Sequence, residues 1–334
     1  MARKSRRTPG EFELIARFFR PLAAGETGAL SLLDDAAVLA VPPGSRLVAT
    51  ADCLVAGVHF LENADPENIA SKLLRVNLSD LAAMGAKPRW YLLAAAFPKT
   101  ASADWIGRFA RALAREQKIF GVTLVGGDTV ATPGPASFTV TALGLATAGQ
   151  ALLRSGARAG DDIYVSGTVG DGALGLRVLQ RRLRLSVAHG RALTARYHRP
   201  TPRIALGRSL VGLAHAAIDV SDGLVADLGH ICETSGVSAA LEADRVPLSP
   251  AARAALDSRP ALLADILTGG DDYELVFTAP RALARRISAL ARTARVPLTR
   301  IGRIVPAGKS APRVQVTDTA GKPLKLGRAG WRHF

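Results

Sequence analysis

The order of strand-like and helix-like segments is the feature that most restricts the fold of this chain. The run WYLLAAAF at 90–97 is apolar enough for a buried strand, and 137–146 alternates apolar and polar residues like a half-buried one. Between them, 102–121 has the spacing of an amphipathic helix. Strands and helices mix in this way without the regular alternation that a doubly wound parallel sheet requires. The pattern predicts an α+β fold.

Further segments continue this mixture over the rest of the sequence. Strands are expected at 46–52, 122–128, 217–222, 274–280 and 298–305, and helices at 11–23, 66–86, 202–214, 223–234 and 280–293. Residues 162–182 are expected to form a strand, a glycine loop and a helix. The 334 residues are enough for two domains, and the turn-rich stretch 149–162 marks the boundary. We therefore expect an N-terminal domain at 1–148 and a C-terminal α/β domain at 149–334.

The sequence also indicates where the protein works. Residues 1–9 are basic but are not followed by the apolar stretch of a signal peptide, so they are expected to be a flexible tail. The chain has no apolar run of transmembrane length. Cys53 and Cys232 have neither the spacing of a metal site nor a disulfide framework. These features predict a cytoplasmic protein without a membrane partner.

A net charge of +15 raises the hypothesis of nucleic-acid binding. The densest basic stretch, 181–203, contains almost no aromatic residues that could stack on bases, and aromatics make up only 5% of the chain. We therefore expect a solvated basic surface and no nucleic-acid partner. Such a surface would also attract phosphorylated small molecules.

Aspartates gather at the ends of the expected strands and in glycine turns. They are Asp34, Asp35, Asp52, Asp128, Asp219, Asp222, Asp271 and Asp272. Asp128 and Asp271 each follow a Gly-Gly pair, one in each expected domain, although so short a repeat could be coincidence. Any single aspartate could be a turn or helix cap. Their number favours a Mg²⁺ site that binds phosphates, because Mg²⁺ prefers carboxylate oxygens. Asp80 adds to this set, since its leucine neighbours make a poor place for an unpaired charge.

Common nucleotide-binding signatures are absent from the sequence. It contains neither the GxxxxGK[ST] loop nor the elements of protein kinases. The glycine-rich stretch 166–175 is expected to be a tight turn that leads into a helix. No Ser-His-Asp arrangement stands out among the six scattered histidines. Phosphate binding, if it occurs, therefore depends on the aspartates.

An ordered set of motifs resembles one known family over nearly the whole chain. The motifs are LLDDAAVL, TADCLVAGVHF, VNLSDLAAMGAKP, VGGDT, LLRSGARAGD, RPTPR, AIDVSDGLVADLGHI, GGDDYEL and GWRHF. Together they resemble the thiamine-monophosphate kinases, which share a superfamily with aminoimidazole ribonucleotide synthetase, selenophosphate synthetase and a hydrogenase maturation factor. The reactive cysteine of the selenophosphate enzyme would precede Cys53, and that of the maturation factor would end the chain, which ends instead in His333-Phe334.

The resemblance implies a two-domain, aminoimidazole ribonucleotide synthetase-like fold and ATP-dependent phosphorylation of thiamine monophosphate to thiamine diphosphate. Mg²⁺ would be the cofactor. The N-terminal domain would bind ATP and metal, and the C-terminal domain would complete the nucleotide and substrate site. A homodimer would form through the N-terminal domains, where the apolar segments 90–97 and 137–146 could pair across a twofold axis.

The resemblance also implies roles for individual residues. The metal ligands would be Asp35, Thr50, Asp52, Asp80, Asp128, Asp219 and Asp222. ATP would contact Gly127, Asp128, Arg154 and Ser221, and the thiamine phosphate would contact His59, Asp271 and Trp331. Asp227, further into the helix, is expected to face solvent. The sequence departs from the family pattern at Leu33, where a glycine is usual, at Ala51, where serine or threonine is usual, and at Asp271, where glutamate is common.

The implied reaction requires no catalytic side chain. The attacking group is a phosphate oxygen, which is already anionic at neutral pH because the second pKa of a phosphate monoester is about 6. Direct in-line transfer assisted by metal ions is therefore expected. Two alternatives remain, namely another ATP-dependent enzyme of the same superfamily and a non-catalytic protein that binds nucleotides or nucleic acid.

Overall fold

The computed structural model describes residues 10–308, 311 and 313–331. These residues form two compact units, one comprising the chain up to Leu78 together with Pro88–Leu145, the other Ser79–Lys87 together with the chain from Ala146 onward. The expected tail at 1–9 and the last three residues of GWRHF lie outside the described residues. Across the described ranges, no helix combines the length and the apolar character that crossing a membrane demands.

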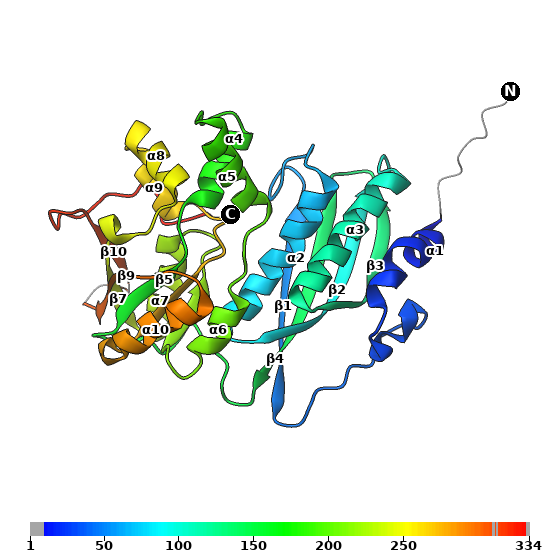
Figure 1. The fold of residues 1–334 in the computed structure, drawn as a ribbon, viewed down its shortest axis with the longest axis horizontal. Coiled ribbons are helices and arrows are strands. Elements are labelled where there is room, and N and C mark those ends of the chain that lie inside the picture. Colours follow the sequence, from blue (N-terminus) through cyan, green and yellow to red (C-terminus); the bar gives the residue numbers. More distant parts are fainter. Residues whose placement is uncertain (1–9, 309–310, 312, 332–334) are drawn as a thin grey trace. The chain divides into compact units, whose positions relative to one another are not determined.

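The described part of the first unit is built on one sheet of four strands. The strands are β1 (Ser45–Val55), β2 (Lys87–Pro98), β3 (Thr123–Thr132) and β4 (Ser137–Thr147), and they lie in the order β1-β4-β2-β3 (Figure 1). β4 alternates buried and partly buried residues along its length, as the sequence predicts. β2 and β4 each have a neighbouring strand on both sides, so neither has a free edge at which a strand of a second copy could add, and the predicted pairing across a twofold axis stays a prediction. The edge strands are β1 and β3.

Helices α2 (Pro66–Ala83) and α3 (Ala103–Phe120) lie over this sheet (Figure 1). Ser102 begins α3 by accepting a hydrogen bond from the Trp105 amide, and Gly121 ends it with a φ of 65°. Phe109 on α3 stacks on Phe138 of β4, with ring centroids 4.8 Å apart. The apolar face of α3 is therefore what fixes the helix on the sheet.

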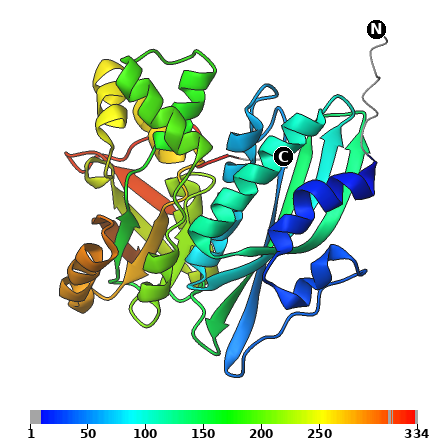
Figure 2. The ribbon, with the colours of Figure 1, turned by 45° about the vertical axis from the view of Figure 1, so that its right-hand side comes forward.

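The expected helix at 11–23 is helical but irregular. It consists of α1 (Glu11–Leu14), a π-helical turn η1 (Ile15–Phe19) and a 3-10 turn η2 (Arg20–Ala23), and a second 3-10 segment η3 (Thr27–Leu32) follows. Pro21 has no amide hydrogen to donate to the preceding turn, so a regular α-helix cannot continue through it. Figure 2 shows this segment against α3 and β3.

The second unit contains a mixed sheet of six strands among the described residues. They are β5 (Asp162–Ser166), β6 (Ala216–Asp219), β7 (Val237–Glu242), β8 (Leu275–Ala279), β9 (Leu298–Pro306) and β10 (Val314–Thr317), in the order β10-β7-β9-β5-β8-β6. The central strand β5 is antiparallel to both neighbours, whereas β10 runs parallel to β7. This mixed sheet confirms the expected α+β class and excludes a doubly wound parallel sheet.

Helices cover both faces of this second sheet (Figure 1). They are α4 (Asp171–Leu179), α5 (Val187–His198), α6 (Ile204–Leu210), α7 (Leu224–Ser235), α8 (Pro250–Ser258), α9 (Leu262–Thr268) and α10 (Ala284–Ala294), with short 3-10 turns η4 (Ala243–Arg245) and η5 (Arg281–Leu283). Ile163 and Val165 of β5 pack in the core under α7, while Tyr164 between them packs in the core under α6 and α10. Each face of the sheet thus has its own hydrophobic core.

Candidate functional site

The first unit holds four of the expected metal ligands, two of them on one strand. Thr50 and Asp52 alternate on one face of β1, and the Asp52 amide donates to Asn77 Oδ1 of α2 at 3.0 Å. Asp35 is exposed in a bend before β1. Leu33, which replaces the usual glycine, has a φ of −112°, so the backbone there needs no glycine.

Asp128, the fourth of these ligands, is exposed on β3 because of two glycines that precede it. The pairing of β2 with β3 shifts register between Tyr91 and Leu92, just before the Gly-Gly pair. Gly127 has a φ of 145°, and a Cβ there would lie 1.9 Å from the Leu93 carbonyl oxygen. Only glycine fits this approach. Asp128 Oδ1 also accepts a hydrogen bond from the Thr129 amide at 2.8 Å.

His59 lies in the turn after β1, where hydrogen bonds orient its ring and its backbone. Its Nδ1 accepts a hydrogen bond from the Val55 amide at 3.0 Å, and Lys72 Nζ donates to its carbonyl at 3.1 Å. A neutral imidazole that accepts at Nδ1 carries its proton on Nε2. Because Nδ1 accepts from Val55, Nε2–H is the donor of this ring.

In the second unit, Ser79 connects two of the expected metal ligands. Ser79 Oγ donates to Asp219 Oδ2 at 2.7 Å, and both residues are buried. Asp80 follows Ser79 on α2 and is half-buried. The sequence reasoning missed Ser79, although it lies inside the motif VNLSD. A hydroxyl donor to a buried carboxylate stabilises the ionised form that could bind a cation.

The turn after β6 departs from the sequence prediction at Asp227. Asp227 is 2% exposed, not a solvent-facing charge. Its Oδ2 accepts hydrogen bonds from the amides of Ser221, Asp222 and Gly223, at 3.1, 3.1 and 3.0 Å. Burial, followed by the nearby charge of Asp222, raises the pKa of Asp227 to about 7, and the three hydrogen bonds oppose that rise. The expectation was wrong because helical spacing alone does not show that Asp227, in the first turn of the helix, reaches back to the amides of the residues that precede the helix.

The loop that carries Asp271 lies directly on this turn. Asp271 donates its amide to the Ser221 carbonyl at 2.9 Å and has a φ of 72°, in the left-handed region. A Cβ on Gly270 would lie 2.1 Å from the same Ser221 oxygen. In both Gly-Gly-Asp motifs, the second glycine therefore fits against a neighbouring carbonyl and an aspartate follows it. The repeat has a common steric cause.

The other two acids of GGDDYEL are buried and bind the protein itself. Asp272 accepts the amides of Gly170 and Gly172 at 2.6 and 3.0 Å, and its burial raises its pKa well above the usual value. Glu274 accepts hydrogen bonds from Ser166 Oγ, from Arg196 and, through two nitrogens, from Arg203. The expectation that 181–203 is simply a solvated basic surface is therefore wrong at these two arginines.

Trp331 and Arg154 complete the expected set in the second unit. The Trp331 amide donates to the Asp222 carbonyl at 3.0 Å, while 48% of the residue's surface is exposed. Arg154 is exposed in a bend, and its carbonyl accepts a hydrogen bond from Ser235 Oγ at 3.4 Å. The turn at 221–223 thus brings together Ser221, Asp222, Asp271 and the Trp331 backbone.

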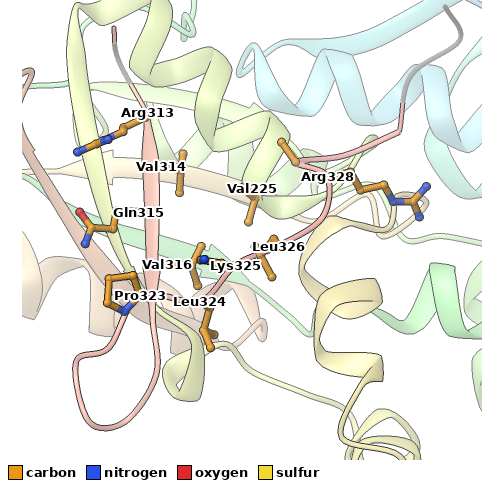
Figure 3. Close-up of a pocket in the computed structure, with 11 residues that line it drawn as sticks. Val225, Arg313, Val314, Gln315, Val316, Pro323, Leu324, Lys325, Leu326 and Arg328 are labelled. Atoms are coloured by element: carbon orange, nitrogen blue, oxygen red, sulfur yellow. The ribbon is translucent and has the colours of Figure 1, made fainter. Parts of the chain in front are cut away.

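A cavity of about 720 Å³ lies beside β10 in this unit (Figure 3). Val225, Val316 and Leu326 converge at its centre, and Arg313 and Arg328 extend toward opposite ends. The two arginines therefore do not meet at one anion. The apolar residues of the cavity include Leu324 and Leu326, which pack against the core of the unit. These contacts hold segment 323–329, which leads to Trp331, on the unit.

The donor types fit a hard cation such as Mg²⁺. All seven expected ligands present carboxylate, hydroxyl or backbone oxygens. Within the described residues, no three histidine, cysteine or acidic side chains gather around one point, so the structure assigns no ion to a particular set. Each unit contributes a separate group of candidate oxygens.

Comparison with known proteins places these observations in a family. Residues 33–146 match the family model of the AIR synthase related protein N-terminal domain, and 158–315 match that of the C-terminal domain. The thiamine-monophosphate kinase of Caulobacter vibrioides is 44% identical over 97% of this chain and 91% of its own length. That of Salmonella typhimurium is 43% identical over 97% and 98%.

Solved structures agree with the sequence relatives. Thiamine-monophosphate kinase from Stenotrophomonas maltophilia K279a superposes with a TM-score of 0.78 at 46% identity, over 84% of this chain and 89% of that one. The complex of AaThiL with AMPPCP and TMP gives a TM-score of 0.77 at 31% identity, over 97% of both chains.

The fold and the aspartate-bearing turns therefore define an AIR synthase related protein with both characteristic domains. The relatives narrow the class further. The chain belongs to the thiamine-monophosphate kinase family.

Proposed function

We propose that this protein transfers the γ-phosphoryl group of ATP to thiamine monophosphate and forms thiamine diphosphate and ADP. The observation that carries this proposal is the full-length similarity to AaThiL, whose solved complex holds AMPPCP and TMP. The curated relatives, at 41–44% identity over 97% of the chain, bear the same activity in their names. The two Gly-Gly-Asp motifs and the turn at 221–223 supply groups suited to phosphates and cations.

The proposed metal ligands are divided between the units. Asp35, Thr50, Asp52 and Asp128 belong to the first unit, and Asp80, Asp219 and Asp222 to the second. When bound, Mg²⁺ would neutralise the repulsion between two phosphorylated reactants, which is the main obstacle to the transfer. Two hydrogen bonds support these positions, because the Asp52 amide on β1 donates to Asn77 Oδ1 and Ser79 Oγ donates to Asp219 at the end of β6.

Other residues are proposed to bind the two substrates. Gly127, Asp128, Arg154 and Ser221 would contact ATP. His59 would donate Nε2–H to the phosphate of the acceptor, because Nδ1 is already an acceptor from Val55. Trp331 would cover the cationic thiazolium ring of thiamine with its indole face, and the Asp271 carboxylate would attract the same cation. No side chain is required as a base, since the attacking phosphate oxygen is already ionised.

We also propose a homodimer that forms through the first unit. The described residues include twelve large, exposed hydrophobic side chains, and nine of them lie in this unit: Phe12, Leu30, Leu33, Val38, Val41, Leu47, Val58, Ile119 and Val130. Exposed apolar surface of this kind is typical of protein interfaces. Leu47 lies on β1 and Val130 on β3, the two edge strands of the sheet.

A substrate panel tests the activity. Purified protein with Mg·ATP is given thiamine, thiamine monophosphate, formylglycinamidine ribonucleotide or selenide, and ADP and products are measured. Only thiamine monophosphate should yield a diphosphate, with one ADP per product, because the hydroxyl of free thiamine would need a base. A different active acceptor would indicate another enzyme of the superfamily. No turnover, together with salt-sensitive retention on DNA, would indicate the non-catalytic alternative.

A His59 variant tests the acceptor side of the proposal. His59→Ala should raise the KM for thiamine monophosphate more than the KM for ATP, because only the acceptor phosphate would lose a donor. An equal rise in both constants would remove His59 from the acceptor site.

A further inference from the structure

The turn at 221–223 supports two of the proposed acceptor contacts through its carbonyl groups. The Ser221 carbonyl accepts the Asp271 amide at 2.9 Å, and the Asp222 carbonyl accepts the Trp331 amide at 3.0 Å. These bonds join three segments that are distant in sequence. The direction of these two carbonyls therefore determines where the Asp271 and Trp331 backbones lie.

The amide groups of the same turn all donate to one buried side chain. Asp227 Oδ2 lies 3.0–3.1 Å from the amide nitrogens of Ser221, Asp222 and Gly223. Asp227 lies in the first turn of α7 and is fully enclosed by the unit. A carboxylate that accepts several backbone amides away from water makes strong, directional hydrogen bonds.

The geometry of the peptide bond connects these two sets of contacts. The Asp222 amide and the Ser221 carbonyl belong to one planar peptide group, and the Gly223 amide and the Asp222 carbonyl belong to the next. In a trans peptide group the N–H and C=O point in opposite directions. Hydrogen bonds that hold the two amides toward Asp227 therefore hold the two carbonyls away from it, toward Asp271 and Trp331.

We propose that Asp227 is a positioning residue that aligns the acceptor-binding residues Asp271 and Trp331 with Asp222, through the two peptide planes of the turn. This inference rests on the proposed function for the roles of those three residues. Asp227 itself contacts neither reactant. It sets the orientation of the backbone on which the proposed metal contact and both acceptor contacts of the second unit depend.

The test compares Asp227→Asn and Asp227→Ala with the same changes at Asp162. Asp162 is a matched control, because it is also a buried aspartate of the second unit, but its partner is Arg300 and it does not contact the turn. Amide hydrogen exchange is measured on peptides that carry Asp222, Asp271 and Trp331. The KM and kcat for thiamine monophosphate and ATP are measured on the same samples.

Asp227→Ala should speed exchange at all three amides and raise the KM for thiamine monophosphate by about 10- to 100-fold, the usual range for groups that orient a site. Asp227→Asn should lie between Ala and wild type, because an amide oxygen still accepts hydrogen bonds. The Asp162 variants should leave the three amides and both KM values unchanged. If Asp227→Ala does not fold, the amide exchange and KM values of Asp227→Asn are compared with those of Asp162→Asn, and this comparison tests the proposal.

Unchanged exchange at Asp271 and Trp331 in the Asp227 variants would overturn the proposal, as would equal kinetic losses in the Asp162 variants. If the wild-type protein does not phosphorylate thiamine monophosphate, the proposed function is overturned instead. In that case the exchange data alone would still decide whether Asp227 aligns the three segments.

Discussion

At the scale of single residues, the acids of this protein fall into two groups with different surroundings. Asp35 and Asp128 are exposed and available to a ligand, whereas Asp227, Asp272 and Glu274 are buried and bind backbone amides or arginines. A buried carboxylate is stable only when the protein supplies its hydrogen bonds. Substitutions in the two groups should therefore have different effects on activity and on stability.

Asp128→Asn should abolish turnover without unfolding the protein. The residue is exposed, and asparagine can still accept the Thr129 amide, so thermal unfolding should shift by no more than a few degrees. Turnover should fall by about 100-fold or more, because a cation ligand contributes several kcal/mol to charge stabilisation. Asp104→Asn, an exposed aspartate in the first turn of α3, is the control. Normal kinetics in Asp128→Asn would exclude this residue from the mechanism.

Cys232 should make stability depend on pH in the alkaline range. Burial, and then the charge of Glu233, raises the pKa of this core thiol from 9.0 to about 11. Between these values the unfolded chain loses the thiol proton while the folded chain keeps it, so the free energy of unfolding falls as pH rises. Below pH 9 this contribution is fully present.

Urea unfolding at pH 8 and pH 10.5 checks this prediction. Cys232→Ala should lose less stability than wild type between the two conditions, whatever its stability at pH 8. Cys53→Ala, which alters an exposed thiol, should behave like wild type. Equal alkaline losses in Cys232→Ala and wild type would contradict the prediction.

The sequence predicted which residue types would occupy the turns but not which of them would be buried. Asp128 directly follows a Gly-Gly pair, whereas Asp227 lies four residues after Gly223 within the expected helix 223–234, and neither pattern shows whether the side chain is buried. Asp227 is buried because its side chain, in the first turn of α7, accepts hydrogen bonds from the amides of residues 221–223. Such a contact depends on the three-dimensional path of the chain, so spacing within one helix could not show it.

At the scale of elements, α4 and α5 illustrate how closely the second unit is packed. A Cβ on Gly175 of α4 would lie 2.4 Å from the Leu193 carbonyl oxygen of α5. A Cβ on Gly190 of α5 would have Val178 Cγ1 as its nearest neighbour, at 3.6 Å. The first distance is far below van der Waals contact and the second is ordinary, so the two helices have room at one position and none at the other.

Gly175→Ala and Gly190→Ala should therefore change stability in opposite directions. Gly175→Ala forces the helices apart and should lower the free energy of unfolding by about 1–3 kcal/mol. Gly190→Ala should raise it by up to about 1 kcal/mol, because alanine is the better helix former. Urea unfolding of both variants measures the difference. Two shifts of the same sign would show that this pair of helices does not pack as described.

The α-helices and strands that the sequence did not predict all lie in the second unit. The strands and helices expected in the first unit are all present, because their apolar runs are long and regular. The helices α5, α8 and α9 and the strands β7 and β10 were not predicted. α5 lies within the basic stretch 181–203, which composition alone described as surface, although Ser186 caps its start. Tertiary contacts, such as that of α5 with α4, stabilise what local pattern leaves ambiguous.

At the scale of the whole molecule, the sequence predicted the α+β class and the family, which are confirmed, whereas the homodimer that it also predicted stays a prediction. The order of the motifs identifies a family because each short motif is weak alone, whereas many of them in the same order along the chain rarely occur by chance. An interface is harder to predict, since apolar strands in a sheet serve its own core as well as a partner. The inner positions of β2 and β4 show this, because their apolar character is already explained by the fold.

A charge placed on the edge of the first unit should therefore separate the proposed homodimer. Wild-type protein at micromolar concentration should give twice the chain mass in light scattering. Leu47→Glu should shift the protein toward monomer, because Leu47 is 47% exposed on edge strand β1 and a buried, unpaired carboxylate would oppose association. Val187→Glu is the control, since Val187 is 80% exposed but lies in the second unit. A monomeric wild type would refute the homodimer, and equal dissociation by both substitutions would show that the interface is not specific to the first unit.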